Sequence, residues 1–236
     1  MPSERVDSGI PGFNELISGG FMPQSQVLLS GEAGTGKTIF SLQYLLAGAK
    51  QSEPGLYITL DEPEVNLAWN MRNFGWDFDR LAQEKLFSVY HMNVFKEGNV
   101  FEKINSEMTQ IEEEIEAIGA KRVVIDSVTA FSIWTGDNQL LRLMMSSTLD
   151  LLRRKHCTSM LPCEALHNES SRFGVEDFLC DAVVMLYMMP QLRALRVKKM
   201  RGTKHDKAIH PYEIMDHGIE VDARQQVMWE AIKDHQ

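Results

Sequence analysis

The chain has 236 residues, a formal net charge of −9 at pH 7, and 44% apolar residues, which allows one domain, residues 1–236, to bury a sizeable core. No run of about eighteen apolar residues occurs, and the first residues lack the basic-then-apolar pattern of a secretory signal, so we expect neither a membrane-spanning helix nor such a signal. The acidic balance argues against a surface that coats nucleic acid, and three cysteines without metal-ligand spacing are typical of a reducing, cytoplasmic compartment.

The first half of the chain alternates short apolar runs with helical patterns. A lead-in of 25 residues, punctuated by glycine and proline, precedes the first run. We expect these elements in chain order: a strand at 26–30, a helix from 37, a strand at 56–60, a helix from about 64 to about 75, and a strand at 85–91. Because strands alternate with helices, the pattern predicts parallel strands.

A long amphipathic helix is predicted at Asn99–Gly119, where isoleucine and methionine recur at spacings of four and three. A strand at Arg122–Asp126, a helix at Gln139–Lys155 and a strand at Thr158–Cys163 are expected to follow. The last part of the chain changes to apolar runs with short links. We expect successive strands there at 182–187, 192–200 and 212–221. The fold predicted is α/β, with a mainly parallel central sheet flanked by helices and extended by a C-terminal antiparallel strand meander.

The segment after the first strand matches the pattern of a phosphate-binding P-loop in full. It consists of Gly31, Glu32, Ala33, Gly34, Thr35, Gly36, Lys37 and Thr38. Glycines let consecutive backbone N–H groups turn toward phosphates, and the following helix adds its positive N-terminal end. Lys37 can reach the β- and γ-phosphates, and the Thr38 hydroxyl can ligate Mg²⁺. Because a strand precedes the pattern and a helix follows it, we expect ATP and Mg²⁺ here rather than a purely structural turn, with Ile39 as an adjoining nucleotide-binding position.

Carboxylates end two of the predicted strands. Asp126 is the candidate that holds the magnesium together with Thr38, although an aspartate after a strand is also typical of a helix N-cap. Asp61 and Glu62 end another strand and could orient and deprotonate an attacking water. Alternatively, one of these two caps the helix that begins near Glu64.

These motifs together resemble the KaiC family of RecA-fold ATPases, and the resemblance covers nearly the whole chain. Its segments, in the family's order, are GIPGFNEL at 9–16, GGFMP at 19–23, the P-loop, DEP at 61–63, NFGWD at 73–77, IDSVT at 125–129, RFGVE at 172–176 and KMRGT at 199–203. The chain is similar to one domain of the clock protein, which carries two. The resemblance implies a homo-oligomeric ring, usually a hexamer, with ATP held between neighbouring subunits. It also implies a regulatory output through a protein partner that the sequence does not name.

A basic segment runs from Arg193 to Lys207, with seven basic residues and one acidic residue, a local charge of +6 that leaves −15 on the rest of the chain. Lys199 and Arg201 are two residues apart on a predicted strand, so their side chains leave on the same face and can converge on one γ-phosphate. The resemblance assigns Lys199 and Arg201 to a finger that acts on the neighbouring subunit's ATP, and His205 and Lys207 to further nucleotide contacts. The alternative is a solvated edge strand whose lysines discourage aggregation.

Two departures from the family pattern bear on turnover. Pro162-Cys163-Glu164 stands where most relatives carry a Thr-Ser-Glu-like run, and a thiol is a weaker hydrogen-bonding group than a hydroxyl. Asp61 stands where the family usually has the first of two adjacent glutamates. Correspondence with the family favours Asp61 as the base, whereas the reach of the longer side chain favours Glu62.

Three functions are compatible with these residues. The leading hypothesis is a Mg-dependent ATPase with slow hydrolysis and a regulatory output. A recombinase relative that acts on DNA is a second, but the chain shows no separate DNA-binding domain, its basic cluster is already assigned to ATP, and Arg172 alone is thin support for phosphate tracking. A nucleotide-gated scaffold with negligible turnover is a third, which the departures at Cys163 and Asp61 permit.

Overall fold

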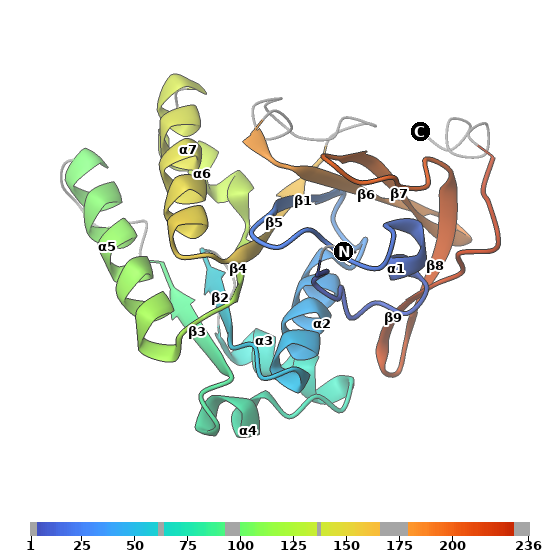
Figure 1. Ribbon diagram of the computed structural model, residues 1–236, viewed down its shortest axis with the longest axis horizontal. Helices are drawn as coiled ribbons and strands as arrows, with labels where there is room; N and C mark the ends of the chain where they lie inside the picture. Colours follow the sequence, from blue (N-terminus) through green and yellow to red (C-terminus); the bar gives the residue numbers. More distant parts are fainter. Residues whose placement is uncertain (1–3, 61–63, 93–99, 136–137, 166–178, 229–236) are drawn as a thin grey trace.

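A single mixed sheet organises the computed structural model, which describes residues 4–60, 64–92, 100–135, 138–165 and 179–228 (Figure 1). The helices of the described residues are α1 (Phe13–Leu16), α2 (Lys37–Lys50), α3 (Glu64–Asn73), α4 (Phe78–Gln83), α5 (Val100–Ile118), α6 (Val128–Thr135) and α7 (Asn138–Arg154). The strands are β1 (Gln26–Gly31), β2 (Gly55–Thr59), β3 (Phe87–His91), β4 (Arg122–Asp126), β5 (Thr158–Glu164), β6 (Ala182–Met189), β7 (Leu192–Met200), β8 (Ile209–Met215) and β9 (Gly218–Val221).

The strands lie in the order β3-β2-β4-β5-β1-β6-β7-β8-β9. The six strands from β3 to β6 in this order run parallel, and β7, β8 and β9 extend the sheet with antiparallel pairings. Parallel neighbours need long crossover connections, which α2 to α7 supply, whereas short turns suffice for the antiparallel strands. The predicted α/β fold with a C-terminal meander is confirmed.

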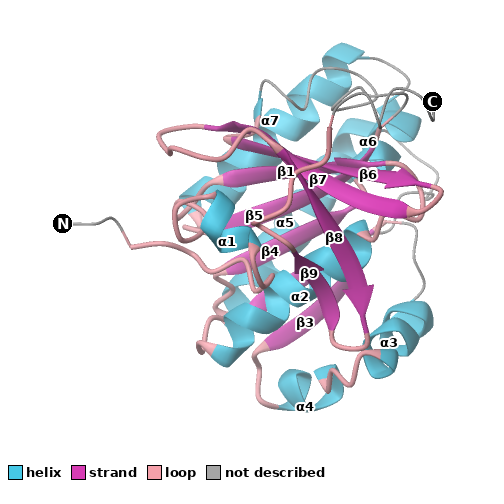
Figure 2. Ribbon diagram, turned by 90° about the vertical axis from the view of Figure 1, so that its right-hand side faces the viewer, coloured by secondary structure: helices cyan, strands magenta, loops and turns pink. Residues whose placement is uncertain are grey.

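Helices cover both faces of the sheet, and strand side chains alternate between two apolar cores. One core packs under α5, α6 and α7, and the other under α1 to α4 (Figures 1 and 2). Within β1, Leu28 belongs to the first core, whereas Val27 and Leu29 belong to the second. The central strands are therefore buried on both sides, and their ends are where polar side chains can gather.

The sequence predicted most elements within a few residues, but the expected single strand at 212–221 is wrong. The segment forms β8 and β9, joined by a tight turn before Gly218. Gly218 has a φ of 120°, and a Cβ there would overlap the side-chain amide of Gln43, so only glycine fits. Apolar residues continue on both sides of the turn, which is why the pattern alone did not reveal it. The short helices α4 and α6 were not predicted either.

A buried arginine joins the N-terminal segment to the amino ends of the strands. Arg122 is fully buried, and its Nε donates to a Glu53 carboxylate oxygen at 2.8 Å. Its Nη1 donates to the backbone carbonyls of Asp7 at 2.7 Å and Tyr44 at 2.9 Å. The guanidinium also lies 4.8 Å from the centre of the Tyr44 ring. Since water cannot solvate a charge at this depth, these contacts are what makes its burial tolerable.

Replacing Arg122 with methionine should lower the free energy of unfolding by about 2–4 kcal/mol, because two carbonyls and Glu53 lose their buried partner. Urea denaturation measures this loss. Arg80→Met is the matched control: Arg80 pairs with Glu84 at 2.8 Å on the exposed surface of α4, so its midpoint should not move. Equal midpoints for the two variants would contradict the account.

Candidate functional site

The predicted P-loop leaves the carboxyl end of β1 and enters α2. Gly34 and Gly36 have φ angles of 80° and 90°, a conformation that L side chains rarely adopt, which explains glycine at these two positions. Thr35 is buried, and its hydroxyl donates to the Glu32 carbonyl at 2.8 Å. Glu32 and Ala33 are exposed at the rim of the loop. The loop is therefore shaped by its own contacts and open toward solvent.

The Lys37 side chain folds back over this loop. Its ammonium donates to the carbonyls of Gly31 at 2.8 Å and Glu32 at 2.9 Å. Burial lowers the pKa of Lys37, while the carboxylates of Asp126 and Glu164 act in the opposite direction. A cation held in this way can exchange two backbone carbonyls for the stronger contacts that an anion offers.

Thr38 and Asp126, the two candidate magnesium ligands, meet across two elements. The Thr38 hydroxyl, in the first turn of α2, donates to Asp126 Oδ2 at 3.1 Å. The Tyr57 hydroxyl donates to the same carboxylate oxygen at 2.5 Å. An adjoining hydroxyl and carboxylate are the hard oxygen ligands that Mg²⁺ prefers, so these residues fit a magnesium site.

Tyr57 was missed by the sequence analysis. It lies in the middle of β2, a strand paired with β4, and faces the same side as Asp126. The signal that could have found it is a tyrosine within an otherwise aliphatic buried strand, because a buried phenol requires a hydrogen-bond partner.

The two candidate bases, Asp61 and Glu62, lie outside the described residues. The preceding strand β2 ends at Thr59, in register with Asp126, and the Leu60 amide donates to the Asp126 carbonyl at 2.9 Å. The chain therefore leaves β2 beside the Thr38–Asp126 pair. The role of Asp61 and Glu62 stays a prediction.

Cys163 lies near the end of β5, between β4 and β1. Its side chain is fully buried and accepts a weak contact from the Thr129 hydroxyl at 3.9 Å, while the Glu164 amide donates to the same hydroxyl at 2.9 Å. Cys163 is in register with Ser30, the residue before Gly31 of the P-loop.

Tyr212 anchors the loop from the antiparallel part of the sheet. It is buried in β8, and its hydroxyl donates to the Thr35 carbonyl at 2.5 Å. A surface groove lined in part by Met188, Arg193 and Ile214 adjoins this contact. Nothing in the local sequence marks Tyr212, since the contact depends on how β8 packs against the loop.

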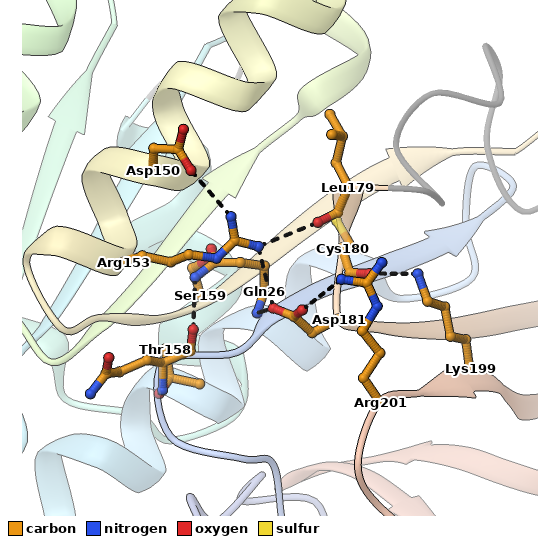
Figure 3. Close-up of polar contacts among 11 residues, drawn as sticks. Gln26, Asp150, Arg153, Thr158, Ser159, Leu179, Cys180, Asp181, Lys199 and Arg201 are labelled. Carbon is orange, nitrogen blue, oxygen red and sulfur yellow. Dashed lines mark hydrogen bonds and ion pairs between the residues drawn. The ribbon is translucent and has the colours of Figure 1, made fainter.

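The predicted finger lies at the opposite end of β1 from the P-loop, and Figure 3 shows its contacts. Lys199 Nζ donates to the Cys180 carbonyl at 2.7 Å, and Arg201 Nη1 lies 3.2 Å from Asp181 Oδ1. Asp181 in turn contacts Gln26, the first residue of β1, whereas the P-loop begins at the last residue of that strand. At about 3.3 Å per residue, the six residues of β1 place Gly31 about 16 Å from Gln26, which contacts Asp181 beside the finger.

His205 and Lys207 lie in the turn that follows the finger. His205 Nδ1 is 3.2 Å from the Thr203 carbonyl oxygen, and the exposed Lys207 accepts a hydrogen bond at its carbonyl from Arg196. The structure therefore keeps the four basic candidates together and apart from the P-loop of the same chain.

No helix of the described residues is long and apolar enough to cross a membrane.

Comparison with known proteins shows the family and the fold. A family model described as the KaiC ATPase matches residues 6–226. A UPF0273 protein of Methanopyrus kandleri is 35% identical over 94% of this chain and 93% of its own length. The circadian clock oscillator protein KaiC of Synechococcus elongatus is 32% identical over 92% of this chain and 44% of its own length. The crystal structure of a KaiC-like protein from Pyrococcus horikoshii superimposes with a TM-score of 0.84 at 34% identity, covering 94% of this chain and 100% of that chain.

Tyr212→Phe should raise hydrogen exchange in the P-loop, because the Thr35 carbonyl loses its anchor. Tyr44→Phe is the matched control, since the Tyr44 hydroxyl makes a similar buried bond to the Thr158 carbonyl at the opposite end of the sheet. Each variant should lose about 1 kcal/mol of unfolding free energy, but only Tyr212→Phe should change exchange of the P-loop amides. Identical exchange in the two variants would refute the anchoring role of Tyr212.

Proposed function

The chain belongs to the KaiC family of ATPases, and from this we propose that residues 1–236 form one domain that hydrolyses ATP at the interfaces of a homo-oligomeric ring. Family membership supports ATP binding and hydrolysis. The observation that carries the shared site is the position of Lys199 and Arg201 at the far end of β1 from the P-loop.

Each subunit supplies the phosphate loop for its own nucleotide. Backbone N–H groups of residues 31–39 and the N-terminus of α2 bind the phosphates, and Lys37 exchanges its present carbonyl contacts for phosphate oxygens. Thr38 and Asp126 hold Mg²⁺, which would neutralise charge on the β- and γ-phosphates when bound. Tyr57 fixes the Asp126 carboxylate through its 2.5 Å hydrogen bond and so sets the direction of this ligand.

The neighbouring subunit supplies the finger. Lys199 and Arg201 cannot reach a phosphate about 16 Å away on the same chain, but a ring built from head-to-tail contacts brings opposite ends of adjacent subunits together. His205 and Lys207, in the adjoining turn, add further contacts to the same nucleotide. Positive groups aimed at the γ-phosphate stabilise the charge that develops on it during transfer to water.

Asp61 or Glu62 orients and deprotonates the attacking water. The chain at the end of β2, described up to Leu60, lies beside Asp126 at the edge of the sheet where the phosphates are proposed to bind. Slow turnover fits two residues of this chain. Asp61 is a shorter acid for activating the water, and the Cys163 thiol is a weaker hydrogen-bonding group than the hydroxyl that relatives carry there. The ring then acts as a regulator that changes state with its nucleotide and binds a protein partner.

Action on DNA is the second candidate, and the described surface gives it little support. Lys199 and Arg201 of the basic segment contact Cys180 and Asp181, and the proposed ring uses them for ATP. Non-specific DNA binding requires several cationic contacts, and the chain as a whole carries a net charge of −9.

Lys37→Ala should abolish tight binding of Mg-ATP, because it removes the one side chain that spans the β- and γ-phosphates.

Wild-type protein should form larger assemblies in Mg-ATP than without it, since a ligand bound by two subunits stabilises the associated state. Light scattering with and without nucleotide, beside a direct binding assay, measures both. Wild-type affinity in Lys37→Ala, or a monomer at every ATP concentration, would refute the proposal.

Mixed rings test whether the finger acts on the neighbouring subunit. Lys37→Ala alone lacks a competent loop, and Lys199→Ala/Arg201→Ala alone should lose ~10³-fold in hydrolysis because it lacks the finger. In an equal mixture, an intact loop meets an intact finger at about a quarter of the interfaces, so activity should return. Phosphate release measures it, after subunit exchange has been shown by a labelled subunit. Exchange without recovery would remove the finger from the neighbour's site.

A further inference from the structure

The Asp181 carboxylate contacts both the start of β1 and the finger residue Arg201. Asp181, which directly precedes β6, accepts the Gln26 amide at Oδ2 (3.0 Å), and its own amide donates to the Gln26 carbonyl at 2.8 Å. Its other carboxylate oxygen lies 3.2 Å from Arg201 Nη1, and its carbonyl accepts the Arg201 amide at 2.9 Å (Figure 3). Asp181 is therefore fixed on β1 and holds both the backbone and the side chain of Arg201.

A second arginine neutralises this carboxylate from the opposite side. Arg153, near the end of α7, places Nη2 3.5 Å from Asp181 Oδ2 and donates to the Leu179 carbonyl at 3.4 Å. Asp150 pairs with the same guanidinium at 3.3 Å on the exposed side of the helix. Arg153 and Arg201 therefore share the Asp181 carboxylate, while Lys199 contacts the neighbouring Cys180 carbonyl.

The burial of the Asp181 carboxylate decides how strongly it can orient the Arg201 guanidinium. The Asp181 side chain is 24% exposed, whereas that of Arg201 is 55% exposed. A carboxylate shielded from water and fixed by a backbone amide loses little freedom when it pairs, unlike a typical surface ion pair. The exposed Arg201 side chain is therefore oriented by the rigid, partly buried carboxylate of Asp181. A guanidinium has five N–H donors in a planar fork, so a contact through Nη1 sets the direction of the whole group.

We propose that Asp181 is a positioning residue that orients Arg201, with Lys199 held beside it on the Cys180 carbonyl, toward the γ-phosphate of the neighbouring subunit. This inference rests on the proposed function, because it requires that the finger act between subunits. Misplacement of a transition-state contact by about 1 Å can cost about 10²-fold in rate. Asp181 therefore acts on hydrolysis without touching the nucleotide.

The same contacts suggest a competing role that the experiment must separate. Gln26 begins the strand that ends in the P-loop, so a defect at Asp181 could instead spread along β1 to the loop of its own subunit. A finger defect and a loop defect lie on opposite sides of a subunit interface. In mixed rings, a subunit with a defective finger is therefore rescued by a partner with an intact finger, and a subunit with a defective loop by a partner with an intact loop.

Asp181→Asn preserves the shape of the side chain and an oxygen for the Gln26 amide but removes the charge that holds Arg201. We expect kcat for ATP hydrolysis to fall about 10- to 100-fold, with KM and Mg-ATP affinity close to wild type because the loop is intact. Asp150→Asn is the matched control, since it removes a carboxylate from Arg153 without contacting Arg201, and its kcat should stay within about twofold of wild type. An unchanged kcat in Asp181→Asn would overturn the proposal.

Mixed rings then assign the defect to one side of the interface. Asp181→Asn should regain activity when mixed with Lys37→Ala, which brings a well-oriented finger, and should regain none with Lys199→Ala/Arg201→Ala, which brings no finger. The reverse pattern would show that Asp181 serves its own loop, and recovery with both partners or with neither would also overturn the positioning role. If Asp181→Asn does not bind Mg-ATP, Asp181→Glu, which keeps the charge one methylene further out, replaces it in the same mixtures.

The mixture of Lys37→Ala with Lys199→Ala/Arg201→Ala is run in parallel as a test of the proposed function alone. If that mixture exchanges subunits and stays inactive, the shared site itself fails. If it recovers activity while Asp181→Asn behaves as wild type, the shared site stands and only the role of Asp181 falls.

Discussion

The strand β1 imposes the constraint on which the rest of the site depends. It carries the P-loop at Gly31 and holds Asp181, and through it the finger, at Gln26. A buried strand in the middle of a sheet, paired to β5 and β6 along its length, cannot bend to bring its two ends together. The groups that bind the phosphates and the groups proposed to stabilise charge on them are therefore kept apart within each chain. Hydrolysis in this account requires a second subunit for that reason.

Two buried tyrosines connect the loop region to strands that lie far away in the chain. Tyr57 fixes the Asp126 carboxylate from β2, and Tyr212 fixes the Thr35 carbonyl from β8. Each hydroxyl meets a polar group that would be costly to leave without a partner in the interior, so its bond also stabilises the packing of the strand that carries it. Arg122 plays a comparable part at the amino ends of the strands, where it joins the N-terminal segment to β4. The antiparallel extension is thus coupled to the phosphate loop as well as to the sheet.

The parts of the molecule that the sequence predicted are those determined by neighbouring residues. Glycine spacing, a lysine and a threonine locate the loop, and periodic apolar residues locate the long helices and central strands, because helix and strand periods act over a few positions. The turn before Gly218 escaped prediction because apolar residues continue on both sides of it. Tyr57, Tyr212 and Asp181 escaped because their partners lie 69, 177 and 155 residues away, and only the pairing of strands brings them together. The basic residues were found from charge and resemblance, but their distance from the loop required the sheet order.

The central claim, that one nucleotide is bound by two subunits, is tested most directly by a structure of the assembled protein with Mg²⁺ and a non-hydrolysable ATP analogue. The account predicts the analogue on the P-loop of one subunit, with Lys199 and Arg201 of the neighbouring subunit within about 3 Å of its γ-phosphate oxygens. Arg201 should keep its contact with Asp181 in that complex. A γ-phosphate contacted by side chains of a single subunit would contradict the account.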